Sequence, residues 1–355
     1  MSDIQTAKLQ IDTVIKKARV HLYKPIQIAE TLYRDRVHGD INLEKLETYR
    51  TQSRQWRDIV CLRFLGRIST SSARYQDDVF NDNATPPDIL KILGKENKRT
   101  GGAVEAYIYK SFQTRQFQMI GALSYASEID YKDFQLKKFL DLFWHEAGLR
   151  RSIDKIFEIV VYSLFLVVIK ELKTTIRVSI PQENLPLLNE FKDFTQSIMG
   201  ITPEVLYREI PASVNRVGTT NASDRGLDMW ANFGPAIQIK HLSLTQELAD
   251  DIVRSVSAEK IVIVCKEAEE KIVKSVLGQL GLKDRIQGIV SETHLIDWYE
   301  KALRGHFSKA LGPKLLQTIR NELKAEFPTS DQTDFLEFFN GRNYHKIKDK
   351  NWNLE

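Results

Sequence analysis

Residues 226–243 constrain the fold of this chain more than any other stretch, because they join two apolar segments through a Gly234-Pro235 step. Proline has no N–H to donate to a sheet, and glycine adopts backbone conformations that other residues avoid. We therefore expect a loop at Gly234-Pro235 with a strand on either side. Gly226-Leu227-Asp228 leads into the first strand, and Gln238-Ile239-Lys240 lies in the second.

The length of this loop decides whether the polar side chains of the hairpin share one face of the sheet. Side chains alternate between the two faces of a strand. A two-residue turn would put Asp228 on the face opposite to Gln238 and Lys240. A three-residue loop over 233–235, or a one-residue bulge, brings the three together. We predict this second register, which pairs Trp230 with Gln238 and Asp228 with Lys240.

An acid, an amide and an ammonium on one face are suited to hold a metal ion and a scissile phosphate. Hydrolysis of a phosphodiester needs a divalent cation, an activated water and positive charge near the transition state. Asp228 is the candidate principal ligand of Mg²⁺, and the Gln238 side chain and the Ile239 backbone offer carbonyl oxygens. Lys240 is the candidate to position the attacking water. The expected catalytic residues are therefore Asp228, Gln238 and Lys240.

Gln238 brings no charge, so we expect a further acid to help retain the metal. Glu158 is the candidate catalytic and metal-binding acid, because it is the only acid in the apolar helix expected over 156–169. Its burial without a partner would be costly, so either a metal site or an ion pair should explain it. Asp224 is the alternative acid. His241 should point to the other face and contribute to packing, not to metal binding.

The length of 355 residues predicts two domains, or one core with a large extension. The sequence pattern changes near residues 148–152. We expect a mainly helical recognition region over 1–150 and a catalytic core over 151–310. A helical extension with a basic tail should follow over 311–355, and the tail is either a basic arm or a frayed end.

Several features indicate a cytosolic protein without disulfides. The longest apolar run, residues 159–169, is too short to span a bilayer. The N-terminal residues have no apolar signal core, and Cys61 and Cys265 are the only cysteines. No histidine or cysteine spacing fits a zinc site or a cysteine nucleophile.

The formal net charge is only +4, but the basic excess lies in the first 150 residues, which carry +5 against −1 for the remainder. Six arginines and a single acid, Asp58, lie between Arg50 and Arg74. Such a cluster suits binding of a phosphate backbone. The hydroxyl-rich segment 69–74 can donate to phosphates or base edges, or can be a plain serine-rich turn. The candidate contacts are Arg50, Arg54, Arg57, Arg67, Ser71, Ser72 and Arg74.

Apolar periodicity predicts a helical N-terminal half, over 3–36, 43–65 and 103–150, with loops at 81–87 and 94–102. From Ser152 onward, helices alternate with strands. The expected elements are a helix (152–173), a strand (174–180), the hairpin (226–243), a helix (244–256), a strand (260–265), a helix (267–280), a strand (286–290) and a helix (293–303). Helices between buried strands imply an α/β fold, in which a central mixed sheet is flanked by helices.

This order of elements, with the Asp228 and Gln-x-Lys motifs, resembles the PD-(D/E)XK nuclease superfamily in its Gln-x-Lys variant. Four segments look like those of HaeII-type type II restriction endonucleases: 23–36, 66–82, 148–164 and 216–244. Asp228, Gln238 and Lys240 match the superfamily motif position by position. The chain departs from the common motif at Gln238, where an Asp or Glu is usual, which puts metal affinity in question.

The resemblance implies Mg²⁺-dependent cleavage of both strands of DNA at a short palindromic site, in bacterial host defence beside a cognate methyltransferase. It points to a G·C-containing hexamer of the RGCGCY kind. A palindromic target requires two sites related by a two-fold axis, so a homodimer is expected. The arginine cluster is then the candidate DNA-binding surface, since arginine binds guanine bidentately.

Two other functions remain open from the sequence. One is a modification-dependent or repair nuclease of the Mrr-like type, which shares the Gln-x-Lys motif. The other is a DNA-binding protein that keeps the nuclease fold without its chemistry, an alternative raised by Gln238. Cleavage of unmethylated DNA in the presence of Mg²⁺ separates these functions from a restriction enzyme.

Overall fold

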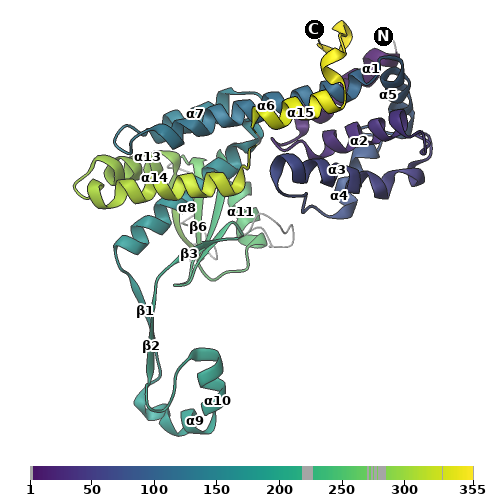
Figure 1. The fold of residues 1–355 in the computed structure, drawn as a ribbon. Coiled ribbons are helices and arrows are strands. Elements are labelled where there is room, and N and C mark those ends of the chain that lie inside the picture. The colour runs from purple at the N-terminus through teal and green to yellow at the C-terminus, as the bar shows by residue number, and fades with distance from the viewer. Residues whose placement is uncertain are drawn as a thin grey trace. The chain divides into compact units, whose positions relative to one another are not determined.

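The computed structural model describes residues 3–217, 227–269, 272, 275, 278, 285–329 and 331–354. These residues form two compact units (Figure 1). Unit 1 contains the residues up to 156 together with those from 320 onward, and unit 2 contains the described residues between them. The division falls inside two helices, α8 (Ile153–Glu171) and α14 (Ser308–Glu326).

Unit 1 is helical, and its apolar core draws on α1, α2, α3, α5, α6 and α15. Local sequence sets several helix ends. Pro87 lies in the first turn of α5, where its missing N–H costs nothing, and Gly66 ends α3 in a left-handed conformation with a φ of 61°. The helices are α1 (Asp3–Lys17), α2 (Tyr23–Val37), α3 (Arg50–Leu65), α4 (Ala73–Asp77), α5 (Pro87–Arg99), α6 (Ala103–Glu128), α7 (Leu136–His145) and α15 (Gln332–Gly341).

The last residues of the chain are part of the unit 1 core and are neither a frayed end nor a free basic arm. The Arg342 guanidinium donates to both oxygens of Glu30, at 2.6 and 2.9 Å. The Tyr344 hydroxyl donates to Glu105 at 2.6 Å, and the Trp352 side chain is fully buried. Glu30 and Glu105 lie on α2 and α6, so the C-terminal residues are bound to helices from the beginning of the chain.

Unit 2 contains a five-stranded mixed sheet within its described residues, which confirms the expected fold class. The strand order is β3-β4-β5-β6-β7. The first three strands are antiparallel, whereas β5, β6 and β7 are parallel. The strands are β3 (Val214–Arg216), β4 (Met229–Ala231), β5 (Ala236–Ser243), β6 (Ile261–Glu267) and β7 (Ile286–Ser291).

Helices cover both faces of this sheet. On one face, α11 (Gln246–Ser255) packs its apolar side on Ala236 and Ile261. On the other face, Phe157 of α8 meets His241 with ring centroids 4.8 Å apart. Helix α13 (Glu292–Arg304) contacts α8, and the Tyr299 hydroxyl of α13 donates to the Val160 carbonyl of α8 at 2.8 Å. The buried strand 260–265 and the helices at 244–256 and 293–303 are thereby confirmed.

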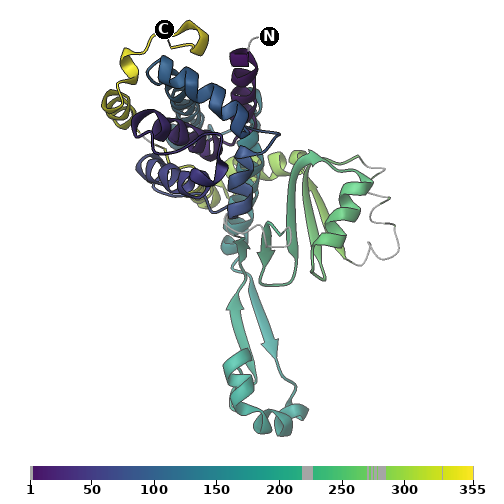
Figure 2. The same cartoon turned by 90° about the vertical axis from the view of Figure 1, so that its right-hand side faces the viewer.

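A separate two-stranded ribbon leaves unit 2 between α8 and β3. Strand β1 (Thr175–Ser179) pairs with β2 (Tyr207–Pro211) in an antiparallel register. Figures 1 and 2 show that the ribbon leads to a helical tip. The tip contains α9 (Leu185–Glu190), α10 (Lys192–Phe194) and a π-helical turn, Thr195–Met199.

Two predictions about these elements are wrong. The strand over 174–180 exists, but it belongs to the ribbon, and β3 takes the neighbouring place in the sheet. The residues 94–99 are not a loop, because they continue α5. Most of the helix expected over 267–280 lies outside the described residues.

Cys61 and Cys265 are both buried and free. Burial raises the pKa of the Cys265 thiol to about 11, so it is unreactive as a nucleophile. Among the described helices, none combines the length and the apolar character needed to cross a membrane.

Candidate active site

The turn between β4 and β5 is longer than predicted, but it preserves the face on which the polar groups lie. Trp230 pairs with Ala236 and Met229 with Ile237, so the predicted pairs of Trp230 with Gln238 and of Asp228 with Lys240 are wrong. Gly234 has a φ of 129° and its N–H donates to Ala231. The observed register differs from the predicted one by two residues, and an even shift leaves the faces unchanged.

Asp228 lies directly before β4 and accepts two hydrogen bonds from β5. The Gln238 side-chain amide donates to Asp228 Oδ2 at 2.6 Å, and the Ile239 backbone N–H donates to the same oxygen at 2.7 Å. Pairing between the strands stops at Ile237. The Asp228 carboxylate therefore takes the position that a backbone carbonyl of β4 would have taken in a longer hairpin.

Gln238 and Ile239 offer oxygens where the predicted metal ligands lie. The Gln238 side chain is 2% exposed, and its Oε1 atom accepts no hydrogen bond among the described residues. A buried carbonyl without a donor is costly, and a cation beside the Asp228 carboxylate would compensate it. The Ile239 N–H points to Asp228, and in a strand the carbonyl of the same residue points to the same side. The carboxylate and the two carbonyl oxygens are ligands that suit a hard divalent cation.

Lys240 lies two residues beyond Gln238 on the same face of β5 and pairs across to Cys265 of β6. Within the part of the chain that the structure describes, its ammonium makes no hydrogen bond or ion pair. The side chain is half-buried. A lysine that no acid neutralises keeps its charge available to an anionic ligand.

Glu158 is buried on α8, as predicted, and an ion pair accounts for its burial. Its Oε1 lies 3.3 Å from Arg216 Nε on β3. Arg216 pairs across to Met229, so alternation puts the arginine on the face opposite to Asp228. Sequence reasoning missed Arg216, because a single arginine in a three-residue strand carries no apolar pattern. Asp224, the alternative acid, lies outside the described residues.

His241 lies on the opposite face of β5, as predicted, away from Gln238 and Lys240. Its Nε2 is 3.1 Å from Glu292 at the start of α13, and its ring packs against Phe157. It therefore joins the sheet to two helices. Among the described residues, no cluster of three or more His, Cys, Asp or Glu side chains has a geometry for a metal ion. The candidate metal site thus depends on Asp228 with amide and backbone oxygens.

The arginine cluster of unit 1 divides into exposed and structural members. Arg50 and Arg54 share Asp77, at 3.0 and 3.4 Å, and Arg50 is half-exposed. Ser72 caps α4 by accepting the Tyr75 N–H, and Ser71, Ser72 and Arg74 are all exposed. The segment 69–74 is thus both a helix start and an accessible surface.

Arg57 and Arg67 do not fit the prediction that they contact DNA. Arg57 is 1% exposed and donates to Gln27 and to Asp58, so its guanidinium is enclosed by its own unit. The helical spacing that suggested a shared face with Arg50 and Arg54 carries it into the interior. Arg67 is partly buried and donates to the Glu326 carbonyl at 2.7 Å, so it fixes the end of α14.

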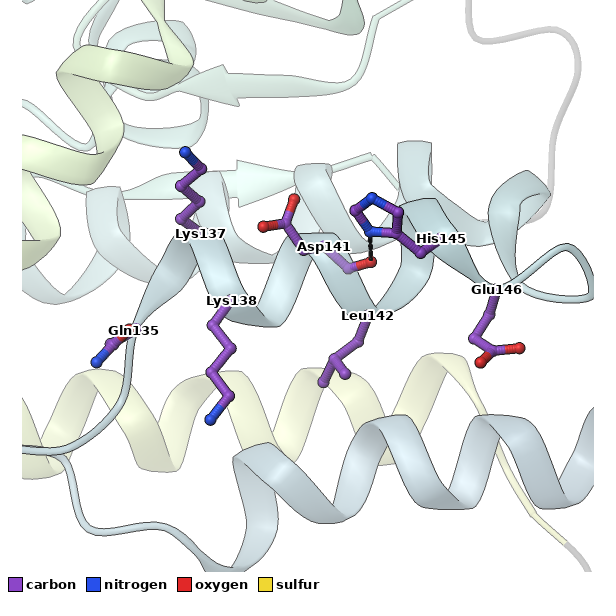
Figure 3. Close-up of a pocket in the computed structure, with 7 residues that line it drawn as sticks. All are labelled: Gln135, Lys137, Lys138, Asp141, Leu142, His145 and Glu146. Carbon is purple, nitrogen blue, oxygen red and sulfur yellow. Dashed lines mark hydrogen bonds between the residues drawn. The ribbon is translucent and has the colours of Figure 1, made fainter.

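A surface hollow along α7 contains none of the predicted site residues. It is lined by seven residues, all between Gln135 and Glu146. Figure 3 shows that Lys137 and His145 point away from Lys138, so the side chains diverge from one another. The His145 ring bonds to the Asp141 carbonyl of its own helix at 2.9 Å. This hollow has no converging groups and is not the candidate active site.

Known proteins resemble this chain over nearly its full length. The model of the HaeII restriction endonuclease family matches residues 7–344. The type II restriction enzyme HaeII of Haemophilus aegyptius is 57% identical over 349 residues, covering 98% of this chain and 99% of the relative. The type II restriction enzyme NgoBI of Neisseria gonorrhoeae is 53% identical over 341 residues, covering 96% and 97%. No solved structure matches the chain.

A helix-flanked mixed sheet that bears an acid, an amide and a lysine on one face is consistent with a nuclease core, and the relatives define a type II restriction endonuclease. Within that class, the chain belongs to the HaeII restriction endonuclease family. The family covers both units, so the helical unit 1 is part of the enzyme and not an unrelated attachment.

Proposed function

We propose that this enzyme hydrolyses phosphodiester bonds in both strands of double-stranded DNA, with Mg²⁺ as cofactor, through a site on the β4–β5 hairpin. The observation that carries the proposal is the contact of Asp228 with Gln238 and Ile239, beside the buried Gln238 Oε1, which accepts no hydrogen bond from the described residues. Type II restriction enzymes generally need a divalent metal. The topology and the Asp and Gln-x-Lys positions support membership of the PD-(D/E)XK superfamily.

Each residue of the proposed site has a distinct role. Asp228 supplies the charged ligand, and Gln238 and Ile239 supply neutral carbonyl oxygens. Gln238 would hold the cation through Oε1, while its Nε2 donates to Asp228. Bound Mg²⁺ supplies charge neutralisation at the phosphate. Lys240 orients the attacking water and stabilises the transition-state charge.

We propose Glu158 as the acid that adds negative charge near the site, together with its partner Arg216. Glu158 lies on α8 and Arg216 on β3, the strand that pairs with β4. Removing the charge of Glu158 would make the net charge of this ion pair more positive. The local potential would then become less favourable for a divalent cation.

The proposed substrate is a short palindromic site in unmethylated DNA, of the RGCGCY kind that the family resemblance implies. A homodimer then follows from the two-fold symmetry of the target. A cognate DNA methyltransferase would protect host DNA in the bacterial cytoplasm. The proposed DNA-contacting residues are the accessible members of the unit 1 cluster: Arg50, Arg54, Ser71, Ser72 and Arg74.

Incubation of the purified enzyme with unmethylated plasmid and Mg²⁺ tests this function directly. We expect discrete fragments that disappear when the metal is chelated or when the plasmid is methylated at its target sites. Fragments formed only from methylated DNA would favour a modification-dependent nuclease. Binding without cleavage would favour a DNA-binding protein that has lost its chemistry.

Lys240→Ala is expected to reduce cleavage about 10²- to 10³-fold while DNA binding remains, because it removes only the charge that acts in the transition state. Plasmid cleavage and gel-shift assays measure the two properties separately. Lys266→Ala is the matched control, since this lysine lies on the neighbouring strand β6. If Lys240→Ala cuts DNA at the wild-type rate, the assignment of the site is wrong.

A further inference from the structure

The helical tip of the ribbon carries a stripe of large apolar side chains that nothing described in the chain covers. Leu187, Phe191, Phe194 and Ile198 are 58%, 51%, 57% and 69% exposed. Isolated exposed apolar residues are common, but a contiguous patch of this kind marks an interaction site. We define these four residues as the tip stripe.

The tip stripe lies on one side of a nearly continuous helical segment. Its residues are separated by four, three and four positions, the spacing of one helix face. The Phe191 N–H donates to the Leu187 carbonyl and the Thr195 N–H to the Phe191 carbonyl, each at 3.0 Å, so helical hydrogen bonds continue between α9 and the π-helical turn. Leu188 is buried instead, and the stripe therefore faces away from the tip's own core.

The charge of the ribbon and its helical tip argues against nucleic acid or an anionic membrane as the partner that covers the tip stripe. Residues 175–211 carry three basic and five acidic side chains. DNA and acidic lipid surfaces both select for an excess of lysine and arginine. A protein surface that is itself apolar is the partner that this stripe fits.

We propose that the tip stripe is a dimer interface and that its occupant is the same stripe of a second copy of this chain. The choice of a second copy rests on the proposed function, since a palindromic target requires two sites related by a two-fold axis. Two tip stripes, one from each copy, form a self-complementary pair when they run antiparallel and meet between Phe191 and Phe194. It sets Glu190 of one copy opposite the uncharged segment 195–197 of the other, so like charges do not meet.

The available area suits such a pair. The stripe and the half-exposed Val205, which follows the π-helical turn in the chain, together expose on the order of 600 Å² per copy, given the size of these side chains. Two copies would bury on the order of 1,200 Å², which is the lower end for a specific interface. Val178 and Tyr207 on the two ribbon strands are also exposed and add to the apolar surface available for the interface.

Sedimentation velocity of the full-length enzyme tests the interface. We expect the wild type to sediment at twice the 41.0 kDa mass of the chain at micromolar concentration. Phe191→Glu with Phe194→Glu should weaken the dimer at least tenfold. The matched control, Asn189→Glu with Gln196→Glu, adds the same charges to the exposed polar side of the same helical segment and should leave the dimer unchanged.

Folding is checked by circular dichroism, and Phe191→Ala with Phe194→Ala provides an uncharged variant that should also weaken the dimer if the glutamates disturb the tip. A monomeric wild type overturns the proposal, as does a stripe variant with wild-type dimer affinity or one that loses only DNA binding. Plasmid cleavage by the wild type is scored separately. A dimer that depends on the stripe but does not cut DNA would refute the proposed function and leave the interface standing.

Discussion

At the residue scale, the orientation of Asp228 is fixed before any ligand binds. Both donors reach the same carboxylate oxygen, and one of them is the Ile239 backbone, which cannot move without disturbing β5. Such preorganisation is a common requirement for transition-state stabilisation. Gln238 therefore positions Asp228 in addition to its proposed role as a ligand.

Glu158→Gln is expected to raise the Mg²⁺ concentration for half-maximal cleavage about tenfold, because it removes the negative charge that faces Arg216. It should also lower the free energy of unfolding by about 3 kcal/mol, as expected when one partner of a buried ion pair is removed. Metal titrations of cleavage and urea unfolding measure the two effects.

Glu171→Gln is the matched control for this variant, since Glu171 pairs with Lys314 near the end of the same helix, where both are more exposed. It should change neither quantity much. A Glu158→Gln enzyme that is less stable but has an unchanged Mg²⁺ requirement would show that the carboxylate stabilises the fold and does not affect the metal.

His21 is expected to make unit 1 sensitive to acid. Burial lowers the pKa of His21 to about 3, helped by the charges of Arg67 and Arg19. The folded-state pKa thus lies below the ordinary value of 6.5, so the unfolded chain binds the proton first as the pH falls. Stability is then lost between about pH 6.5 and pH 3, at up to about 1.4 kcal/mol per pH unit.

His21→Gln should remove this contribution, so that its free energy of unfolding falls about 2 kcal/mol less than that of the wild type between pH 6.5 and pH 5. Urea unfolding at the two pH values measures the difference. The control is His345→Gln, because His345 is exposed in the same unit. Identical pH dependence of the wild type and His21→Gln would show that His21 is not the acid-sensitive group.

At the element scale, the β4–β5 hairpin depends on the conformation of one glycine. Gly234 has a φ of 129°, which side chains rarely allow, although a Cβ there would meet no atom within 4 Å. Gly234→Ala should therefore cost about 1–3 kcal/mol through backbone strain alone. Since the hairpin sets the position of Asp228, cleavage should fall as well.

Gly288→Ala on β7 is the matched control, because a Cβ there also meets no atom and the φ is ordinary. Thermal unfolding and plasmid cleavage should be close to those of the wild type. Equal stability of the two alanine variants would contradict the role of the Gly234 backbone in the turn.

The sequence predicted some elements well because their side chains carry the pattern. A continuous apolar run predicted β6. The alternation of side chains predicted that Asp228, Gln238 and Lys240 share one face, and they do so because the observed register differs from the predicted one by an even number of residues. It did not predict β2 or β3, because these are short and carry few buried residues. The exact register was missed because the turn is closed by backbone hydrogen bonds that no residue type specifies.

At the scale of the whole molecule, the C-terminal residues complete a core that begins at the N-terminus. Trp352 is fully buried, so Trp352→Ala should lower the free energy of unfolding by about 3–5 kcal/mol. Trp144→Ala removes the same side chain from an exposed position of unit 1 and should cost much less. Thermal unfolding measures both, and an unchanged melting temperature for Trp352→Ala would show that the tail does not contribute to the core.

This arrangement has a consequence for synthesis of the enzyme. Residues 335–354 supply five members of the cluster that encloses α1 and α2, so these two helices lack part of their core until residues 335–354 have been synthesised. Domains usually fold in the order in which they are translated. Unit 1 departs from that order, because α1 and α2 cannot complete their packing until residues 335–354 have left the ribosome.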